Sequence, residues 1–213
     1  SGWRSAMDAD DPTSHRCGHV AIVGRPSVGK STLLNALVGE RISITSRKPQ
    51  TTRHRINGIL TEPGAQFVFV DTPGFQTRHA SPLNARLNRA VREALADVDV
   101  VVWVVDAARV IDPDRRVLAL VPPDKPAIAV LNKVDAVADK ASLLPRIAEV
   151  ASIRAFEAIV PVSAERGTSL RELKAEIART LPRGPAIYGP DDLTDRDERF
   201  LAAEYLREQI FRR

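Results

Sequence analysis

The chain is poor in thiols and in aromatic rings, with one cysteine, six phenylalanines, two tyrosines and two tryptophans among 213 residues. A lone thiol, Cys17, forms neither an internal disulfide nor a thiolate zinc site, which excludes disulfide-stapled and zinc-finger proteins. It fits a reducing compartment, so we expect a cytoplasmic protein. Long apolar runs are also lacking. The longest, Val98 to Val105, is interrupted by Asp99 and falls far short of the roughly 20 apolar residues that span a bilayer, which excludes an integral membrane segment.

An excess of charge of one sign is almost absent as well. The 31 Lys and Arg residues against 27 Asp and Glu residues give a formal net charge of +4, and 44% of the residues are hydrophobic. This composition is typical of a globular domain and excludes an intrinsically disordered chain. Since the surplus is small, contact with nucleic acid has to be argued from local clusters of basic residues.

Strand-like apolar runs alternate with helical patterns from His19 onward. The alternation predicts a doubly wound α/β fold with a mostly parallel, six-stranded sheet. Only the five residues Thr-Glu-Pro-Gly-Ala join the second and third runs, too few for a crossover helix, so this pair is expected to be antiparallel. The expected strands are 19–23, 55–60, 66–70, 98–105, 127–131 and 158–162, and the expected helices are 30–38, 82–96, 114–120, 140–153 and 169–180.

Proline and glycine mark a boundary near the end of the chain, where residues 181–192 hold three prolines and two glycines. We expect a flexible leader or tag remnant at 1–16, the α/β domain at 17–181, a linker at 182–193, and the start of a C-terminal domain at 194–213. Ala202, Leu206 and Ile210 share one face of an expected amphipathic helix after the linker. That helix either docks back on the sheet or belongs to a second domain.

Residues 24–31 read GRPSVGKS and match the phosphate-loop pattern G-x-x-x-x-G-K-[ST]. The match lies between an apolar run, 21–23, and a helical run, 32–37, which is the strand–loop–helix context that the pattern requires. Glycines let backbone N–H groups surround a phosphate, Lys30 neutralises its oxygens, and the Ser31 hydroxyl ligates Mg²⁺. A glycine-rich turn before an ordinary helix is the alternative. The residues expected at the phosphates of ATP or GTP are Gly24, Arg25, Pro26, Ser27, Val28, Gly29, Lys30, Ser31 and Thr32.

The sequence NKVD, residues 132–135, follows the expected strand 127–131, and carboxyl ends of strands are where open α/β sheets bind ligands. A carboxylate at Asp135 can accept hydrogen bonds from guanine N1–H and the 2-amino group, a pair of donors that adenine does not offer. Ser163 follows the next strand at the matching place, although a helix-capping serine is the alternative. The residues expected around the base are Asn132, Lys133, Val134, Asp135, Ser163 and Ala164.

The sequence DTPGF, residues 71–75, follows the expected strand 66–70. A carboxylate there can hold Mg²⁺ through water, and the Gly74 N–H can contact the γ-phosphate; an ordinary Asp-Pro-Gly turn is the alternative. In QTTRH, residues 50–54, we choose Thr52 over Thr51 as a magnesium ligand, with an ordinary surface loop as the alternative. The expected nucleotide contacts here are Asp71, Thr72, Pro73, Gly74 and Phe75; the expected magnesium ligands are Ser31, Thr52 and Asp71; and the expected catalytic residues are Lys30, Thr52 and Gly74.

The ordered motifs GRPSVGKS, QTTRH, DTPGF, NKVD and SA resemble the Era and EngA branch of translation-factor-type GTPases. The stretches SITSRKPQTTRHRI and LTDRDERFLAAEYLREQIFRR are similar to the bacterial Era family in particular, and the resemblance covers roughly His19 to Arg213. It implies a slow, Mg²⁺-dependent GTPase switch, converting GTP to GDP, in 16S rRNA processing and small (30S) ribosomal subunit assembly. It also implies rRNA contact mainly through a C-terminal KH domain. No GXXG loop follows the linker, so we expect that domain to be missing here; peripheral association with the inner membrane stays open.

Two residues depart from the family pattern. Relatives often carry Asn at the position of Ser27, where it helps to hold an activating K⁺, so the use of K⁺ is uncertain here. Phe75 stands where Ras-type GTPases place a water-orienting Gln. Because a phenyl ring cannot orient water, we expect slow intrinsic hydrolysis that another group or a ribosomal partner completes.

Basic residues gather between Arg41 and Thr61, where five Lys or Arg occur without an acid. This cluster either faces RNA phosphates or is a solvated region that serves the nucleotide. Two other functions stay open as alternatives: a nucleotide-gated RNA-binding module of another Era- or EngA-like GTPase, and a P-loop ATPase or kinase. Asn132 to Asp135 disfavour the ATPase or kinase.

Overall fold

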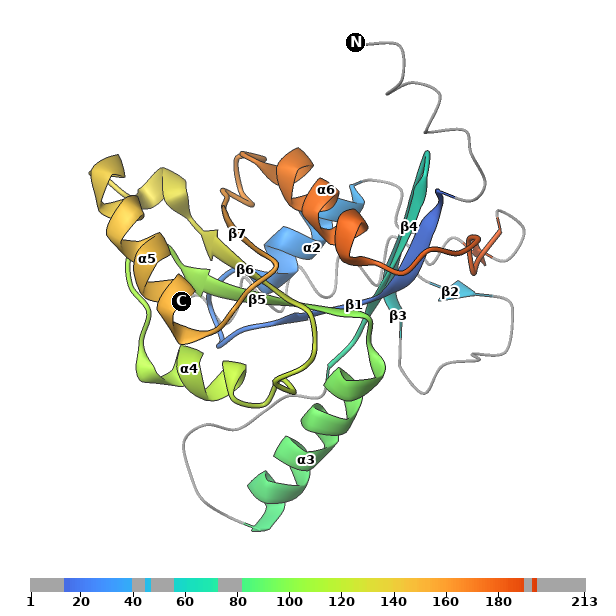
Figure 1. Ribbon diagram of the computed structural model, residues 1–213, viewed down its shortest axis with the longest axis horizontal. Coiled ribbons are helices and arrows are strands. Elements are labelled where there is room, and N and C mark those ends of the chain that lie inside the picture. Colours follow the sequence, from blue (N-terminus) through green and yellow to red (C-terminus); the bar gives the residue numbers. More distant parts are fainter. Residues whose placement is uncertain (1–13, 40–44, 47–55, 73–81, 190–192, 195–213) are drawn as a thin grey trace.

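The computed structural model describes residues 14–39, 45–46, 56–72, 82–189 and 193–194, which include a twisted six-stranded sheet (Figure 1). Its strands lie in the order β3-β4-β1-β5-β6-β7. All neighbours are parallel except β3 and β4, which are antiparallel and joined by a short turn. The predicted fold class and the predicted antiparallel pair are confirmed. The strands are β1 (Arg16–Val23), β3 (Ile56–Glu62), β4 (Ala65–Val70), β5 (Val100–Asp106), β6 (Ala127–Asn132) and β7 (Ala158–Pro161).

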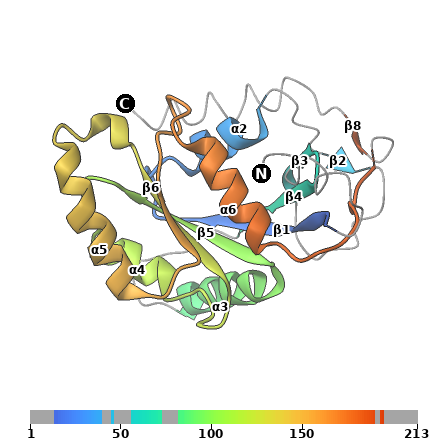
Figure 2. The same ribbon diagram turned by 45° about the horizontal axis from the view of Figure 1, so that its top comes forward.

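Helices cover both faces of this sheet, as Figures 1 and 2 show. On one face, α2 (Lys30–Val38) and α6 (Leu170–Thr180) contribute Leu33, Leu37, Leu173 and Ile177 to a buried cluster with the strands. The second cluster lies beneath α3 (Pro82–Asp97), α4 (Asp112–Leu118) and α5 (Leu143–Ile153). Strands buried on both faces explain the near-continuous apolar runs in the sequence. Within the described ranges, no helix is long and apolar enough to cross a membrane.

Two predicted element boundaries differ from the observed ones by three residues, and the others agree to within two. Strand β1 begins at Arg16, three residues before the predicted start, because residues 16–18 pair with 65–67 of β4 despite their weak apolar pattern. The predicted helix 140–153 is a short 3₁₀ turn, Lys140–Ser142, followed by α5 from Leu143. Pro145 has no N–H to donate to the carbonyl of Ala141, so an α-helix cannot run unbroken through this turn.

The described part of the predicted linker lies against the sheet. Its first residues border β1, where Cys17 N donates to Pro182 O (3.1 Å) and Gly184 N donates to His15 O (2.9 Å). Further along, the side chain of Tyr188 is buried against Ile56, Ile59 and Val68 of the β3–β4 pair. We call residues 182–189 the C-terminal strap.

Gln66 of β4, which is fully buried, holds this strap. Its Oε1 accepts hydrogen bonds from Ile187 N (2.9 Å) and Tyr188 N (3.0 Å), and its Nε2 donates to Tyr188 O (2.7 Å) and Thr61 Oγ1 (2.9 Å). The amide therefore replaces a strand neighbour for backbone groups that would otherwise be buried without partners.

Beyond the strap, β8 (Leu193–Thr194) pairs antiparallel with β2 (Thr45–Ser46). The described chain after the strap thus touches the stretch that follows α2. The amphipathic helix expected after Thr194 lies outside the described residues.

We expect Gln66→Leu to lower the free energy of unfolding by about 3 kcal/mol, because it leaves buried backbone groups of the strap unpaired at about 1–3 kcal/mol each. The measurement is urea unfolding, together with hydrogen exchange of the Ile187 and Tyr188 amides, which should become fast. Ile187→Ala is the control, since this side chain is 37% exposed and its loss should cost little. Strap amides that stay protected in Gln66→Leu would contradict the role of this glutamine.

Candidate functional site

The phosphate-loop sequence 24–31 connects the end of β1 to the start of α2, and neighbouring atoms leave no room for a side chain at either of its two glycines. A Cβ at Gly24 would lie 2.7 Å from Val104 O, and one at Gly29 would lie 2.5 Å from Asn132 Nδ2. Gly29 also has φ +95°, a conformation that favours glycine. The two glycines of the motif are thus required by the close approach of β5 and β6.

The first turn of α2 begins directly in the loop. Gly29 is its N-cap residue and provides no side-chain cap, and the first turn contains no acidic residue. Uncapped N–H groups at a helix N-terminus, together with the helix dipole, favour an anion. Both the sequence motif and the uncapped start of α2 therefore indicate a phosphate-binding site.

Lys30 points back over the loop. Its Nζ donates to the carbonyl oxygens of Gly24 and Arg25, the latter at 3.2 Å. Burial lowers the pKa of this ammonium group. A partly desolvated ammonium held over the loop can transfer its hydrogen bonds to phosphate oxygens, which are stronger acceptors.

A cavity of about 180 Å³ brings Lys30, Ser31, Asp71 and Thr72 together beside the loop. The hydroxyl of Ser31 and the carboxylate of Asp71 are hard oxygen donors of the kind that Mg²⁺ prefers. Both line this cavity, so the predicted pair fits a magnesium ion. The other residues predicted for the phosphates and the metal at this side, Thr52, Pro73, Gly74 and Phe75, lie outside the described residues.

Asn132, at the end of β6, joins the phosphate loop to the loop after β7. Its Nδ2 donates to Val28 O (2.8 Å), its Oδ1 accepts from Ala164 N (3.0 Å), and the residue is 2% exposed. Next to it, Lys133 adopts a left-handed conformation (φ 66°) and its Nζ donates to Ser27 O (2.6 Å). Asn132 and Lys133 thus tether the phosphate loop to the ends of β6 and β7, and this tether acts through hydrogen bonds from side chains to backbone groups.

Asp135 lies in a 3₁₀ turn, Val134–Ala136, directly after this tether. Ser163 Oγ, which is fully buried, donates to Asp135 Oδ1 (2.7 Å), and Arg166 Nε lies 3.7 Å from Asp135 Oδ2. The hydrogen bond from Ser163 is the main cause that lowers the pKa of Asp135. The carboxylate is therefore held ionised and oriented, ready to accept two donors from a ligand.

Three other predicted contact residues differ in what they can offer a ligand. Val28 is fully buried in the core, so only its backbone faces the loop. Pro26 and Ser27 are exposed at the loop's outer edge. Ser27 has φ 72°, an uncommon value for a residue other than glycine.

One further pair reaches the loop without belonging to a motif. The guanidinium of Arg25 contacts Asp114 of α4, with Nε 3.0 Å from Oδ1. The sequence around Asp114 shows only a charged helix start, and no local signal links it to a loop 89 residues earlier. This contact was therefore missed by sequence reasoning.

Comparison with known proteins agrees with this site. The family model described as "50S ribosome-binding GTPase" matches residues 19–133. GTPase Era of Bordetella pertussis is 54% identical over 197 residues, 92% of this chain and 67% of that protein. GTPase Era of Nitrosomonas eutropha is 52% identical over 200 residues, 94% of this chain and 68% of that protein.

Solved structures give the same relationship. A variant of Aquifex aeolicus Era bound to GDP and AlF4⁻ superposes with a TM-score of 0.71 and 39% identity, over 91% of this chain and 66% of that one. Era in complex with MgGDPNP and nucleotides 1506–1542 of 16S ribosomal RNA has a TM-score of 0.71 and 38% identity over the same shares. This chain spans about two thirds of the length of these relatives. Sequence identity above half across nearly the whole chain, on this sheet and with this loop geometry, means that the chain belongs to the Era family of GTPases.

Proposed function

We propose that this GTPase is a slow, guanine-specific switch that acts in 16S rRNA processing and small (30S) ribosomal subunit assembly. The observation that carries the guanine specificity is the Ser163–Asp135 contact. It orients a carboxylate three residues after Asn132, which itself contacts the phosphate loop at Val28 O. The link to ribosomal RNA is supported by the structure of a relative, Era, with a fragment of 16S rRNA.

In this proposal, GTP reacts with water to give GDP and phosphate, without a covalent intermediate. Lys30 and the N–H groups at the start of α2 stabilise negative charge on the transferring phosphoryl group. Ser31 and Asp71, with Thr52, would hold Mg²⁺, which screens the phosphate oxygens when it is bound. Gly74 would contact the γ-phosphate. Phe75 would provide no hydrogen bond to the attacking water, which would make hydrolysis slow.

The division of the chain belongs to the same proposal. Residues 17–181 form the GTPase domain, 182–193 connect it to the next part of the chain, and 194–213 begin an RNA-binding C-terminal domain of the KH type. The RNA contact is assigned to that domain because the resemblance to the Era family implies it there. The five basic residues of the predicted cluster between Arg41 and Thr61 lie outside the described residues. On α3, Arg86, Arg89 and Arg92 are accompanied by Glu93 and Asp97.

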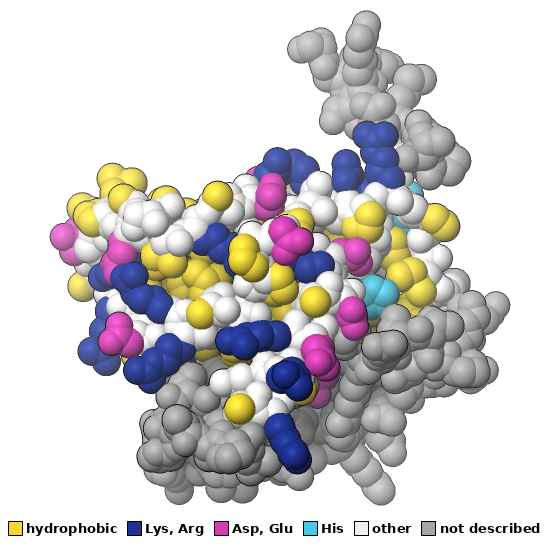
Figure 3. Space-filling model, turned by 60° about the horizontal axis from the view of Figure 1, so that its bottom comes forward, with side chains coloured by type: hydrophobic (Ala, Val, Ile, Leu, Met, Phe, Trp, Pro, Cys, Tyr) yellow, Lys and Arg dark blue, Asp and Glu magenta, His cyan; other side chains and the backbone are white. Residues whose placement is uncertain are grey.

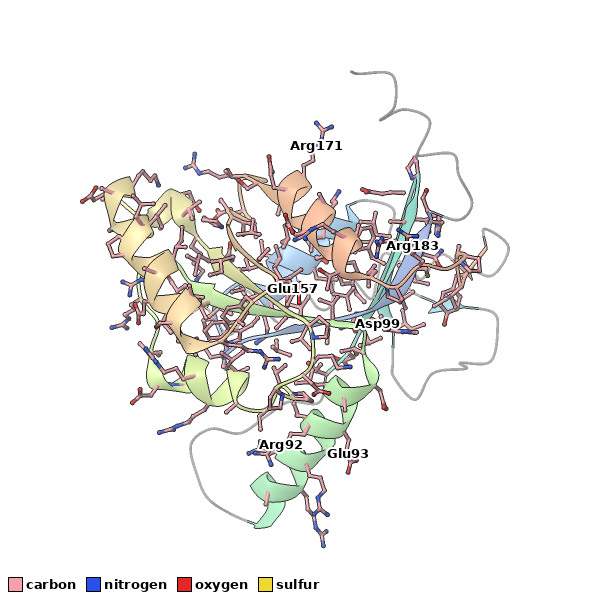
Figure 4. The ribbon with its side chains drawn as sticks, in the orientation of Figure 1. Arg92, Glu93, Asp99, Glu157, Arg171 and Arg183 are labelled. Atoms are coloured by element: carbon pink, nitrogen blue, oxygen red, sulfur yellow. The ribbon has the colours of Figure 1, made fainter. Side chains whose placement is uncertain are left out.

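Figure 4 shows Arg92 and Glu93 both projecting from α3. Figure 3 shows the molecule from the side on which α3 lies. On this face, Lys and Arg side chains are interspersed with Asp and Glu side chains. A nucleic acid backbone is attracted by a continuous basic surface, which mixed charges do not provide.

The direct test of the partner is phosphate release from GTP by this chain, alone and with purified small ribosomal subunits. We expect slow release by the chain alone, faster release with small subunits, and none above background for Lys30→Ala. This variant removes the positive charge that would face the phosphates and does not disturb the core. Circular dichroism checks that Lys30→Ala is folded. Equal stimulation by large subunits would contradict the assigned partner, and hydrolysis of ATP at the rate of GTP would contradict the assigned substrate.

We expect Asp135→Asn to weaken GDP binding by at least about a hundredfold, since it removes charge-assisted hydrogen bonds worth about 1.5–3 kcal/mol each. Binding should shift toward xanthine nucleotides, whose 2-oxo group accepts a hydrogen bond from the new amide. Competition titrations with GDP, XDP and ADP measure this. Asp124→Asn is the matched control, because Asp124 is an exposed Asp that precedes β6, at the opposite end of this strand from Asp135. The assignment is wrong if the wild-type chain binds ADP as tightly as GDP.

Ser27 predicts the response to monovalent ions. Its hydroxyl lacks the amide carbonyl of asparagine, so we expect nearly equal hydrolysis rates in matched KCl and NaCl. Ser27→Asn should introduce a preference for K⁺, and the left-handed backbone at this position suits asparagine. A large K⁺ preference in the wild type, equal to that of the variant, would show that backbone oxygens alone build an ion site.

A further inference from the structure

Asp114 is a fully buried carboxylate outside every nucleotide-binding motif. It lies in the first turn of α4, and its two oxygens have different partners. Oδ1 accepts from Arg25 Nε at 3.0 Å, and Oδ2 accepts from Ile111 N at 2.8 Å. The side chain therefore bridges the start of α4 and the phosphate loop.

The backbone of Asp114 is anchored as firmly as its side chain. Its carbonyl oxygen accepts from Nε1 of Trp103 (3.1 Å), a fully buried residue of β5 that stacks on Phe156 with 5.6 Å between ring centroids. Burial raises the pKa of Asp114, while the Ile111 N–H and the Arg25 charge lower it. A buried carboxylate loses its hydration, and the Ile111 N–H and the Arg25 guanidinium offset only part of that loss, so the pKa of Asp114 stays raised.

Arg25, the partner of this carboxylate, is itself a residue of the phosphate loop. Arg25 directly follows Gly24, and the carbonyls of these two residues are the acceptors for Lys30 Nζ. The second half of the loop is held from the other side, at Ser27 O and Val28 O, by Lys133 and Asn132. The first half is held by Lys30 at its carbonyls and by β5 packing on Gly24, and the Arg25–Asp114 contact adds a side-chain link from this half to α4.

We infer that Asp114 is a positioning residue for guanine-nucleotide binding, which holds Arg25 and thereby keeps the first half of the phosphate loop in its binding conformation. The inference rests on the proposed binding of GTP and GDP at this loop. A loop that is already ordered loses less conformational entropy when a ligand binds, so the contact raises affinity without touching the ligand.

A purely structural role makes a different prediction. If Asp114 only caps α4 and receives the Trp103 hydrogen bond through its backbone, its substitution lowers stability and leaves nucleotide affinity unchanged. The Arg25 side chain then has no influence on affinity through Asp114. Affinity and stability must therefore be measured on the same variants.

The experiment titrates a fluorescent GDP analogue, mant-GDP, into the wild-type chain, Asp114→Asn, Arg25→Ala, Arg25→Lys and the double variant Asp114→Asn/Arg25→Ala. In Asp114→Asn the amide oxygen can still accept the hydrogen bond from Ile111 N. The NH₂ group then faces the Nε–H of Arg25, and two donors cannot form a hydrogen bond. We expect Kd to rise about tenfold for Asp114→Asn and for Arg25→Ala, a difference of about 1.4 kcal/mol. Arg25→Lys should lie between these variants and the wild type, because it keeps the charge but not the position of the Nε–H group.

The double variant decides whether the two residues act as one unit. Its Kd should match that of the single variant with the higher Kd. If the two residues contributed independently, the two tenfold increases would multiply to about a hundredfold. Asp112→Asn is the control, since Asp112 is the exposed Asp in the same turn and should leave Kd unchanged. Thermal denaturation of every variant reports the structural cost separately.

Three results would overturn the inference: an unchanged Kd in Asp114→Asn with lowered stability, additive effects in the double variant, or an unchanged Kd in Arg25→Ala. The last of these decides even if Asp114→Asn does not fold. Since the wild-type titration reports nucleotide binding itself, wild-type binding with unaffected variants refutes only this inference. Absence of wild-type binding refutes the proposed function as well.

Discussion

A single buried amide, that of Asn132, connects the parts of the molecule on which nucleotide binding depends. Its NH₂ group is bonded to the phosphate loop at Val28, and its oxygen is bonded to the loop after β7 at Ala164. Because it is almost fully buried, loss of either contact would leave a polar group without water or partner, at about 1–3 kcal/mol. The relative position of the phosphate loop and the loop after β7 is therefore set by where β6 ends in the sheet.

The same sheet explains why the phosphate loop has so little freedom. Strand β5 approaches Gly24 and the end of β6 approaches Gly29, so each glycine is packed against an element far away in the chain. Asn132 and Lys133 hold the second half of the loop, and the Arg25–Asp114 pair reaches the first half from α4. Because contacts within the protein order the loop, the loop loses less conformational entropy when a ligand binds.

The C-terminal strap shows the same use of a buried polar side chain. Proline- and glycine-rich composition is typical of a linker, and the described strap has no regular secondary structure of its own. Backbone groups of Ile187 and Tyr188 in the strap are nevertheless paired, since Gln66 provides both a donor and an acceptor for them. The strap leads to the pairing of β8 with β2, so the chain beyond it is tied to the part of the GTPase domain that follows α2.

Local patterns in the sequence were sufficient for the six strands, the antiparallel pair, the phosphate loop, and the order of Asn132, Lys133 and Asp135. These features depend on residue periodicity and on short motifs, which act within a few positions along the chain. Asp114 and Gln66 could not be predicted, because their partners lie 89 and about 120 residues away and have no signature of their own. Only the packed sheet brings these polar groups together, and it makes their contacts obligatory since burial removes water as an alternative partner.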